Sequence, residues 1–90
     1  MSIDIAIHKT HRQFAGGAER VSVEGKTVGQ CLDRLIQQYP QMKAILFDRK
    51  GRIKNTIEIY VNMESAYPDE LKKPVKNGDV IHIALMLAGG

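Results

Sequence analysis

The sequence has little of several residue types that mark particular protein classes. A single cysteine, Cys31, excludes an internal disulfide. Tryptophan is absent and aromatic residues make up only 6% of the chain, so few rings are available for stacking on bases. No apolar run approaches the roughly 20 residues of a membrane span, and the stretch 1–7, interrupted by Asp4, is too short for a secretory signal. We therefore expect a cytoplasmic protein that binds neither membrane nor nucleic acid.

What is present is typical of one small globular domain. The chain has 90 residues, of which 43% are hydrophobic and 26% charged, with a formal net charge of +3. A domain of this size buries only about 60–65% of the surface that its unfolded chain exposes. It has room for one modest core and not for a deep catalytic cleft.

Hydrophobic periodicity predicts the secondary structure. Apolar and polar residues alternate in four segments, which is typical of strands with one buried face. The predicted strands cover residues 3–7, 18–24, 57–62 and 80–85. Apolar residues at helical spacing from Val28 to Tyr39 predict an amphipathic helix, with Thr27 and Gln30 as a capping box and Pro40 at its end. Residues 42–47 predict a second short helical turn, and residues 8–17 a long polar loop.

This order of elements predicts an α+β protein with a β-grasp, or ubiquitin-like, architecture. One main helix would cross a mixed sheet of four or five strands, with the two terminal strands adjacent and parallel in the middle. A split β-α-β sandwich is the alternative, but it needs a second long helix. We expect a β-grasp domain over residues 1–84 and a flexible tail over residues 85–90.

The body of the chain carries no motif that predicts catalysis. Residues 25–27 (Gly-Lys-Thr) lack the glycine that a phosphate loop needs five residues earlier, where Arg20 stands. Cys31 lies on the apolar stripe of the helix, where a thiol is inert. The three histidines do not have metal-ligand spacing, so no metal site is expected. They are His8, His11 and His82.

The remaining chemically available group is the carboxylate of Gly90, at the end of an apolar tail. The tail residues are Leu85, Met86, Leu87, Ala88, Gly89 and Gly90. Because Gly89 and Gly90 lack a Cβ, this end could enter a channel too narrow for any other residue. The preceding apolar residues would bury surface at the mouth of that channel.

The whole chain resembles the ubiquitin-like sulfur carriers. This MoaD/ThiS-like family includes the small subunit of molybdopterin synthase and the carriers for thiamine and cysteine synthesis. Matching segments include Phe14-Ala15-Gly16-Gly17, Thr27-Val28-Gly29, Ile59-Tyr60-Val61-Asn62, Gly78-Asp79 and Gly89-Gly90. Some relatives have prolines where Leu85 and Met86 stand here.

The resemblance implies a carrier and not an enzyme. A partner related to the ubiquitin-activating enzymes would use ATP and Mg²⁺ to adenylate Gly90, and a sulfur donor would convert the adenylate to a thiocarboxylate. A synthase subunit would then accept the sulfur in cofactor or cysteine biosynthesis, with Leu85 to Gly90 in its channel. The carrier itself would hold no cofactor, and it could be the non-catalytic small subunit of a molybdopterin-synthase-like complex.

Two other functions remain open at this stage. The same activation could feed a ubiquitin-like modifier that is joined to lysines through Gly90. A plain binding module whose tail has no role is the third hypothesis. In each case Tyr60 and His82, on the predicted outer face of the sheet, are candidate docking residues, although a solvent-facing strand residue explains Tyr60 equally well.

Overall fold

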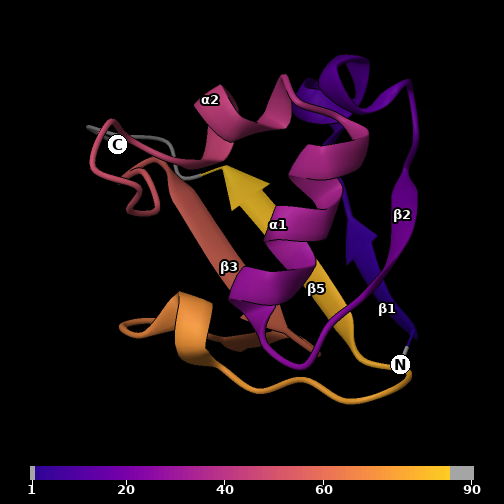
Figure 1. Cartoon of the computed structure of the whole chain (residues 1–90), viewed down its shortest axis with the longest axis vertical. Helices are drawn as coiled ribbons and strands as arrows, with labels where there is room; N and C mark the ends of the chain where they lie inside the picture. Colours follow the sequence, from indigo (N-terminus) through magenta and orange to yellow (C-terminus); the bar gives the residue numbers. More distant parts are fainter. Residues whose placement is uncertain (1, 86–90) are drawn as a thin grey trace.

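The computed structural model describes residues 2–85 and consists of a five-stranded sheet with helices on one face (Figure 1). The strands are β1 (Ser2–Ala6), β2 (Arg20–Glu24), β3 (Ile57–Val61), β4 (Glu64–Ser65) and β5 (Val80–Leu85). The α-helices are α1 (Val28–Gln38) and α2 (Met42–Leu46), and two 3₁₀ helices, η1 (Lys9–Ala15) and η2 (Glu70–Lys72), complete the fold. The predicted α+β class and β-grasp architecture are confirmed.

The strand order β2-β1-β5-β3-β4 places the first and last strands side by side. β1 and β5 are parallel, with Ile5 opposite Ile81, and the other neighbouring pairs are antiparallel. The prediction of a parallel central pair is therefore confirmed. Because β5 lies between β1 and β3, the last described strand is held on both sides over part of its length.

The core lies between the inner face of the sheet and the apolar stripe of α1. Ile5, Ile59 and Ile81 come from the sheet and meet Leu32 and Leu35 of the helix, all at 0–2% exposure. Each such side chain contributes roughly 1.5–3 kcal/mol by leaving water. This burial is what fixes α1 across the strands.

The predicted N-cap of α1 is confirmed, but the second hydrogen bond of the predicted capping box goes to a different backbone N–H. The Thr27 hydroxyl accepts a hydrogen bond from the Gln30 backbone N–H at 3.2 Å. The Gln30 side chain accepts from the backbone N–H of Lys26, at 2.8 Å, one residue before the position that a capping box uses. The helix ends at Gln38, with Tyr39 as its C-cap before Pro40.

The prediction of a polar loop over residues 8–17 is wrong for the central part of that segment. Residues 9–15 form η1, and His11 and Ala15 of this helix are buried. The pattern was missed because a 3₁₀ helix repeats every three residues and this one is only seven residues long. Strand β2 also begins at Arg20 and not at Ala18, which packs against the core as part of the connection.

A polar network joins the start of β5 to the end of β3. The Asn62 side chain donates to Asp79 Oδ1 at 2.9 Å and accepts from the Val80 backbone N–H at 3.0 Å. Asp79 Oδ2 accepts from the Lys76 backbone N–H at 2.9 Å. These bonds, led by the one from Asn62, hold the pKa of the largely buried Asp79 below its ordinary value. The network fixes the turn from which β5 starts.

Candidate functional site

The outer face of the sheet carries both residues predicted for docking. The strand registers place Tyr60 opposite His82, and His82 opposite Ala6 on its other side. Arg20 and Ser65 extend this row to the two outermost strands. Because the alternate strand residues are buried on the inner face, this row projects to the side away from α1. The structure therefore brings Tyr60 and His82 together, and their docking role stays a prediction.

Tyr60 is anchored by its own strand. Its hydroxyl donates a hydrogen bond to Glu58 Oε2, two residues earlier on the same face. This bond, together with the negative charge of Glu58, raises the pKa of Tyr60. The phenol therefore stays neutral at physiological pH, and the half-buried ring offers apolar surface with one fixed polar end.

Small side chains lie on two sides of His82. Ala6 lies beside it on β1, and Ala84 follows two residues later on the same face of β5; all three are half-buried. Glu58 lies opposite Ala84 on this face, and farther out Asp4 lies 3.6 Å from Arg20. A face that combines an aromatic ring, small side chains and a few charges suits a transient protein contact.

Strand β5 links this face to the C-terminal tail. Its pairing with β1 ends at His82, whereas its pairing with β3 continues to Leu85, which lies opposite Ile57. Leu85 is half-buried against the core, so it belongs to the sheet as well as to the predicted tail. Its fold contact reduces the apolar surface that it can offer a partner. The other predicted tail residues, Met86, Leu87, Ala88, Gly89 and Gly90, lie outside the described residues.

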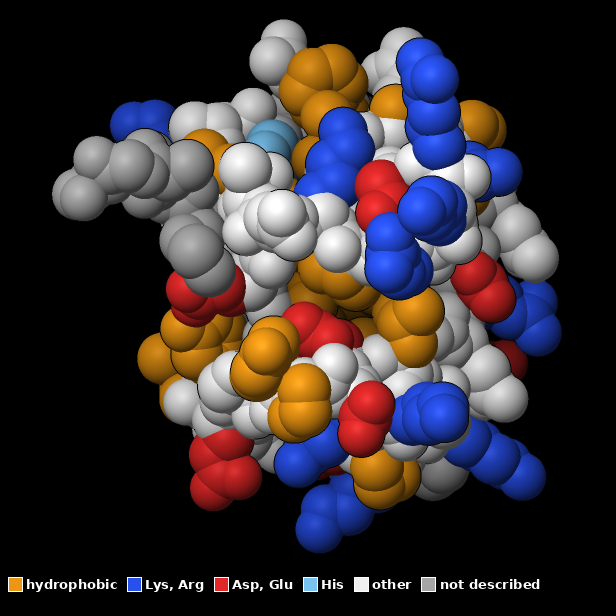
Figure 2. All heavy atoms as spheres, turned by 90° about the vertical axis from the view of Figure 1, so that its left-hand side faces the viewer, with side chains coloured by type: hydrophobic (Ala, Val, Ile, Leu, Met, Phe, Trp, Pro, Cys, Tyr) orange, Lys and Arg blue, Asp and Glu red, His pale blue; other side chains and the backbone are white. Residues whose placement is uncertain are grey.

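A groove of about 740 Å³ beside β3 is a feature that the sequence did not indicate. Three neighbouring segments between Arg52 and Lys72 fold together to form it: residues 52–55, residues 57–60, and Ser65 with residues 67–72. Figure 2 shows the hollow, with apolar side chains at its bottom and Lys and Arg side chains gathered above it. No local pattern could have predicted this groove because it exists only where the three segments converge.

The remaining candidates hold no evident reactive site. Cys31 is 0% exposed, and burial raises the pKa of its thiol, as expected for a core cysteine. His11 is buried on η1, where burial and then the nearby His8 lower its pKa. Within residues 2–85, no group of three His, Cys, Asp or Glu side chains could hold a metal ion. In the same range, no helix is long and apolar enough to cross a membrane.

A family model and a relative similar over its full length assign the chain to a family. The model of the ThiS family matches residues 5–90. The sulfur carrier protein CysO of Mycobacterium tuberculosis is 29% identical over 93 residues, covering 100% of both chains. The chain therefore belongs to the ThiS family.

Solved structures agree with this assignment. The complex of BexX and CysO from Amycolatopsis orientalis contains a similar chain, with a TM-score of 0.88 and 29% identity over 98% of this chain and 99% of that one. SAMP1 from Haloferax volcanii, a small archaeal modifier protein, has a TM-score of 0.86 and 25% identity over 100% of both chains. One of these relatives is called a sulfur carrier and another a modifier.

Proposed function

We propose that this protein is a sulfur carrier whose Gly90 carboxylate is converted to a thiocarboxylate. The observation that carries the proposal is the family match, which extends through the tail to residue 90. The likeness to CysO over the full length of both chains supports it. Strand β5 adds a physical reason, since it holds the chain up to Leu85, the residue directly before the rest of the tail.

The proposed chemistry has two steps. An activating enzyme transfers AMP from ATP, with Mg²⁺, to the Gly90 carboxylate and releases pyrophosphate. Sulfur delivered as hydrosulfide then attacks the acyl carbon, so a C–S bond forms, the C–O bond to AMP breaks and AMP leaves, and loss of the sulfur proton to solvent gives the thiocarboxylate. Adenylation is needed because a free carboxylate is a poor electrophile.

In this proposal the chain provides position and not catalysis. A synthase subunit accepts the sulfur from the tail, and tethering presents the thiocarboxylate at a high effective concentration. Residues 86–90, at about 3.3 Å each, would reach roughly 16 Å beyond Leu85. In a complex like molybdopterin synthase, this chain would be the non-catalytic subunit. Its cytoplasmic location is part of the same proposal.

Intact-mass spectrometry tests the proposal. The purified chain is incubated with its activating enzyme, ATP, Mg²⁺ and a sulfur source. We expect a gain of about 16 Da, the difference between sulfur and oxygen, on the acyl carbon. The matched control is the chain without Gly89 and Gly90, which keeps all described residues and should gain nothing. An unchanged mass while the enzyme consumes ATP in the presence of the chain would contradict sulfur transfer.

The outer face of the sheet is the proposed docking surface for the activating enzyme. We expect Tyr60→Ala to slow thiocarboxylate formation about tenfold, since a well-packed interface aromatic is worth more than 1 kcal/mol. Arg34→Ala is the control because Arg34 is exposed on α1, on the opposite side of the sheet. Equal rates for both variants would exclude docking through Tyr60.

A ubiquitin-like modifier is the second candidate, and the likeness to SAMP1 favours it. The same activated Gly90 would then be attacked by a lysine amine of a target protein. Proteomics of cells that contain the chain would detect Gly-Gly remnants on lysines if it is a modifier. Remnants that disappear with deletion of Gly89 and Gly90 would support tagging, and their absence would favour sulfur transfer alone.

A further inference from the structure

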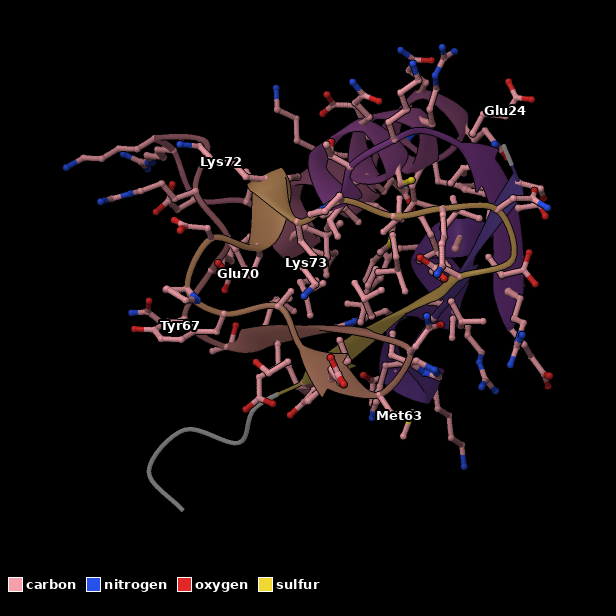
Figure 3. The ribbon with its side chains drawn as sticks, turned by 90° about the horizontal axis from the view of Figure 1, so that it is seen from below. Glu24, Met63, Tyr67, Glu70, Lys72 and Lys73 are labelled. Atoms are coloured by element: carbon pink, nitrogen blue, oxygen red, sulfur yellow. The ribbon has the colours of Figure 1, made fainter. Side chains whose placement is uncertain are left out.

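The groove beside β3 has an apolar floor between two walls of different charge. Ile57 and Ile59 are buried at its floor, and Ile53 and Leu71 line it as half-buried side chains. In Figure 3, Glu70 and Lys72 are on the short helix η2 that follows β4, and Tyr67 lies at the same edge of the molecule. An open groove with this much apolar lining is a candidate contact surface.

One wall of the groove is basic. Arg52 and Lys54 come from the loop that precedes β3, and no acidic residue of that loop segment lines the groove. Arg52 lies 3.7 Å from Asp48, but the Arg52 side chain is 70% exposed, so this ion pair is weak. Both cations can therefore meet an acidic partner group.

The opposite wall is acidic over Asp69 and Glu70. Within residues 2–85, neither carboxylate lies within 4.0 Å of a cationic nitrogen. Glu58 adds a third carboxylate near the floor, while Lys72 lies at the end of this wall. The two walls therefore have complementary charge, which is the arrangement that a surface needs to bind a copy of itself.

Tyr67 supplies a side chain that could fill such a groove. It lies at the rim, on the acidic wall, and is 77% exposed. An exposed tyrosine is costly to leave in water, and tyrosine is among the residues that contribute most to protein interfaces. Met63 is the other large hydrophobic residue with comparable exposure, at 75%, and it lies outside the groove at a different corner (Figure 3).

We infer that the groove binds a second copy of this chain in a symmetric dimer. In a two-fold arrangement the basic wall of each copy faces the acidic wall of the other, so Arg52 and Lys54 meet Asp69 and Glu70 twice. The Tyr67 ring of each copy occupies the apolar groove of the other. This inference uses no tail residue and does not depend on the sulfur chemistry of the proposed function, but the groove shares Tyr60 with the proposed docking surface.

The size of the groove sets the expected strength of the dimer. Fifteen residues line it, whereas a standard stable interface uses about 20–30 residues on each side. The dimer should therefore be weak and dependent on concentration. Because opposite charges contribute, raising the salt concentration should weaken it further.

Sedimentation equilibrium of the full chain tests the dimer over about 0.01–2 mM, the range in which a small interface dissociates. We expect a molecular mass that rises from monomer to dimer with concentration, and a smaller rise at high salt. Tyr67→Ala should weaken association about tenfold, and Met63→Ala, the matched control, should leave it unchanged. A wild-type chain that stays monomeric throughout overturns the inference, as does an equal effect of both substitutions.

Charge reversal gives a sharper test of the two-wall arrangement. One variant carries Arg52→Glu and Lys54→Glu, and the other carries Asp69→Lys and Glu70→Lys. Each variant alone should be monomeric because its two walls then have the same sign. An equimolar mixture should form a heterodimer, since both wall-to-wall contacts become complementary again. A mixture that stays monomeric while the wild type dimerises would show that another surface is responsible.

A chain ending at Leu85 distinguishes a second copy from another occupant of the groove. Because the described residues are retained, its dimerisation should match that of the full chain. If deletion of residues 86–90 abolishes association, the tail and not the second copy's Tyr67 is responsible, and the inference is wrong.

Discussion

Gly29, the second residue of α1, should resist replacement by alanine even though alanine favours helices. A Cβ at Gly29 would lie 2.9 Å from the backbone oxygen of Leu71 and 3.3 Å from its Cβ. The segment after η2 is bound to the start of α1 near this point, since the Val28 N–H donates to the Lys73 carbonyl at 2.9 Å. The Val75 N–H donates to the Lys26 carbonyl, also at 2.9 Å. The backbone at Leu71 therefore cannot move away without strain.

The expected change in stability for Gly29→Ala is the sum of two opposing contributions. Alanine gains up to about 1 kcal/mol over glycine in a helix interior, and less in the first turn. Forcing an extra methyl group into a packed contact costs about 1–3 kcal/mol. The contact is with backbone atoms, so no side-chain rotation can relieve it. We expect a net loss of about 1 kcal/mol, which lowers Tm by about 4–8 °C for a domain of this size.

Thermal unfolding followed by circular dichroism measures this difference. Gln37→Ala is the control because Gln37 is exposed on the same helix, and its substitution should change stability by less than about 0.5 kcal/mol. Adding Leu71→Ala to Gly29→Ala should not restore stability, since alanine keeps both the backbone oxygen and the Cβ. A Gly29→Ala variant with a higher Tm than the wild type would refute this reasoning.

Three further predictions concern single residues. Thr27→Ala should cost about 1 kcal/mol because the cap of α1 is lost, and an unchanged urea midpoint would argue against the cap. Asp79 has a lowered pKa when folded, so its contribution to stability is present above its ordinary pKa of 3.8 and is lost as the pH falls through the lowered value. Asp79→Asn should therefore flatten the acid side of the stability curve, and an identical acid slope in both proteins would contradict this. Cys31 should react with a thiol reagent only as fast as the chain unfolds, because it is 0% exposed. Rapid reaction of the native protein would contradict the burial of this side chain.

The helix and the long strands could be predicted because their signals are local. Val28 to Tyr39 carries a wide apolar stripe, and the isoleucines of β1 and β3 alternate strictly, so each element shows which face it buries. A helix or strand that buries one face needs apolar residues at the repeat of that element. Neither terminal strand carries the proline or the charge pattern that is typical of an edge strand. Together with the order of elements, this predicted that β1 and β5 lie side by side in the middle of the sheet.

Short and irregular elements could not be predicted in this way. Strand β4 has two residues, both exposed, and forms only because β3 offers it a partner. Helix η1 is recognisable as a helix only from the core that His11 and Ala15 enter. The Gln30 side chain accepts from the N–H of Lys26 and not from that of Thr27, which the capping box uses, and no residue pattern distinguishes the two.

By itself, the sequence determined the fold class and the cap on Thr27, because these depend on local pattern and residue type. Only the tertiary structure decided that Tyr60 and His82 are neighbours, that Leu85 packs on the core, and that a charged groove lies beside β3. The physical reason is the range of the interactions. Periodicity acts within one segment, whereas a surface is made where segments distant in sequence come together.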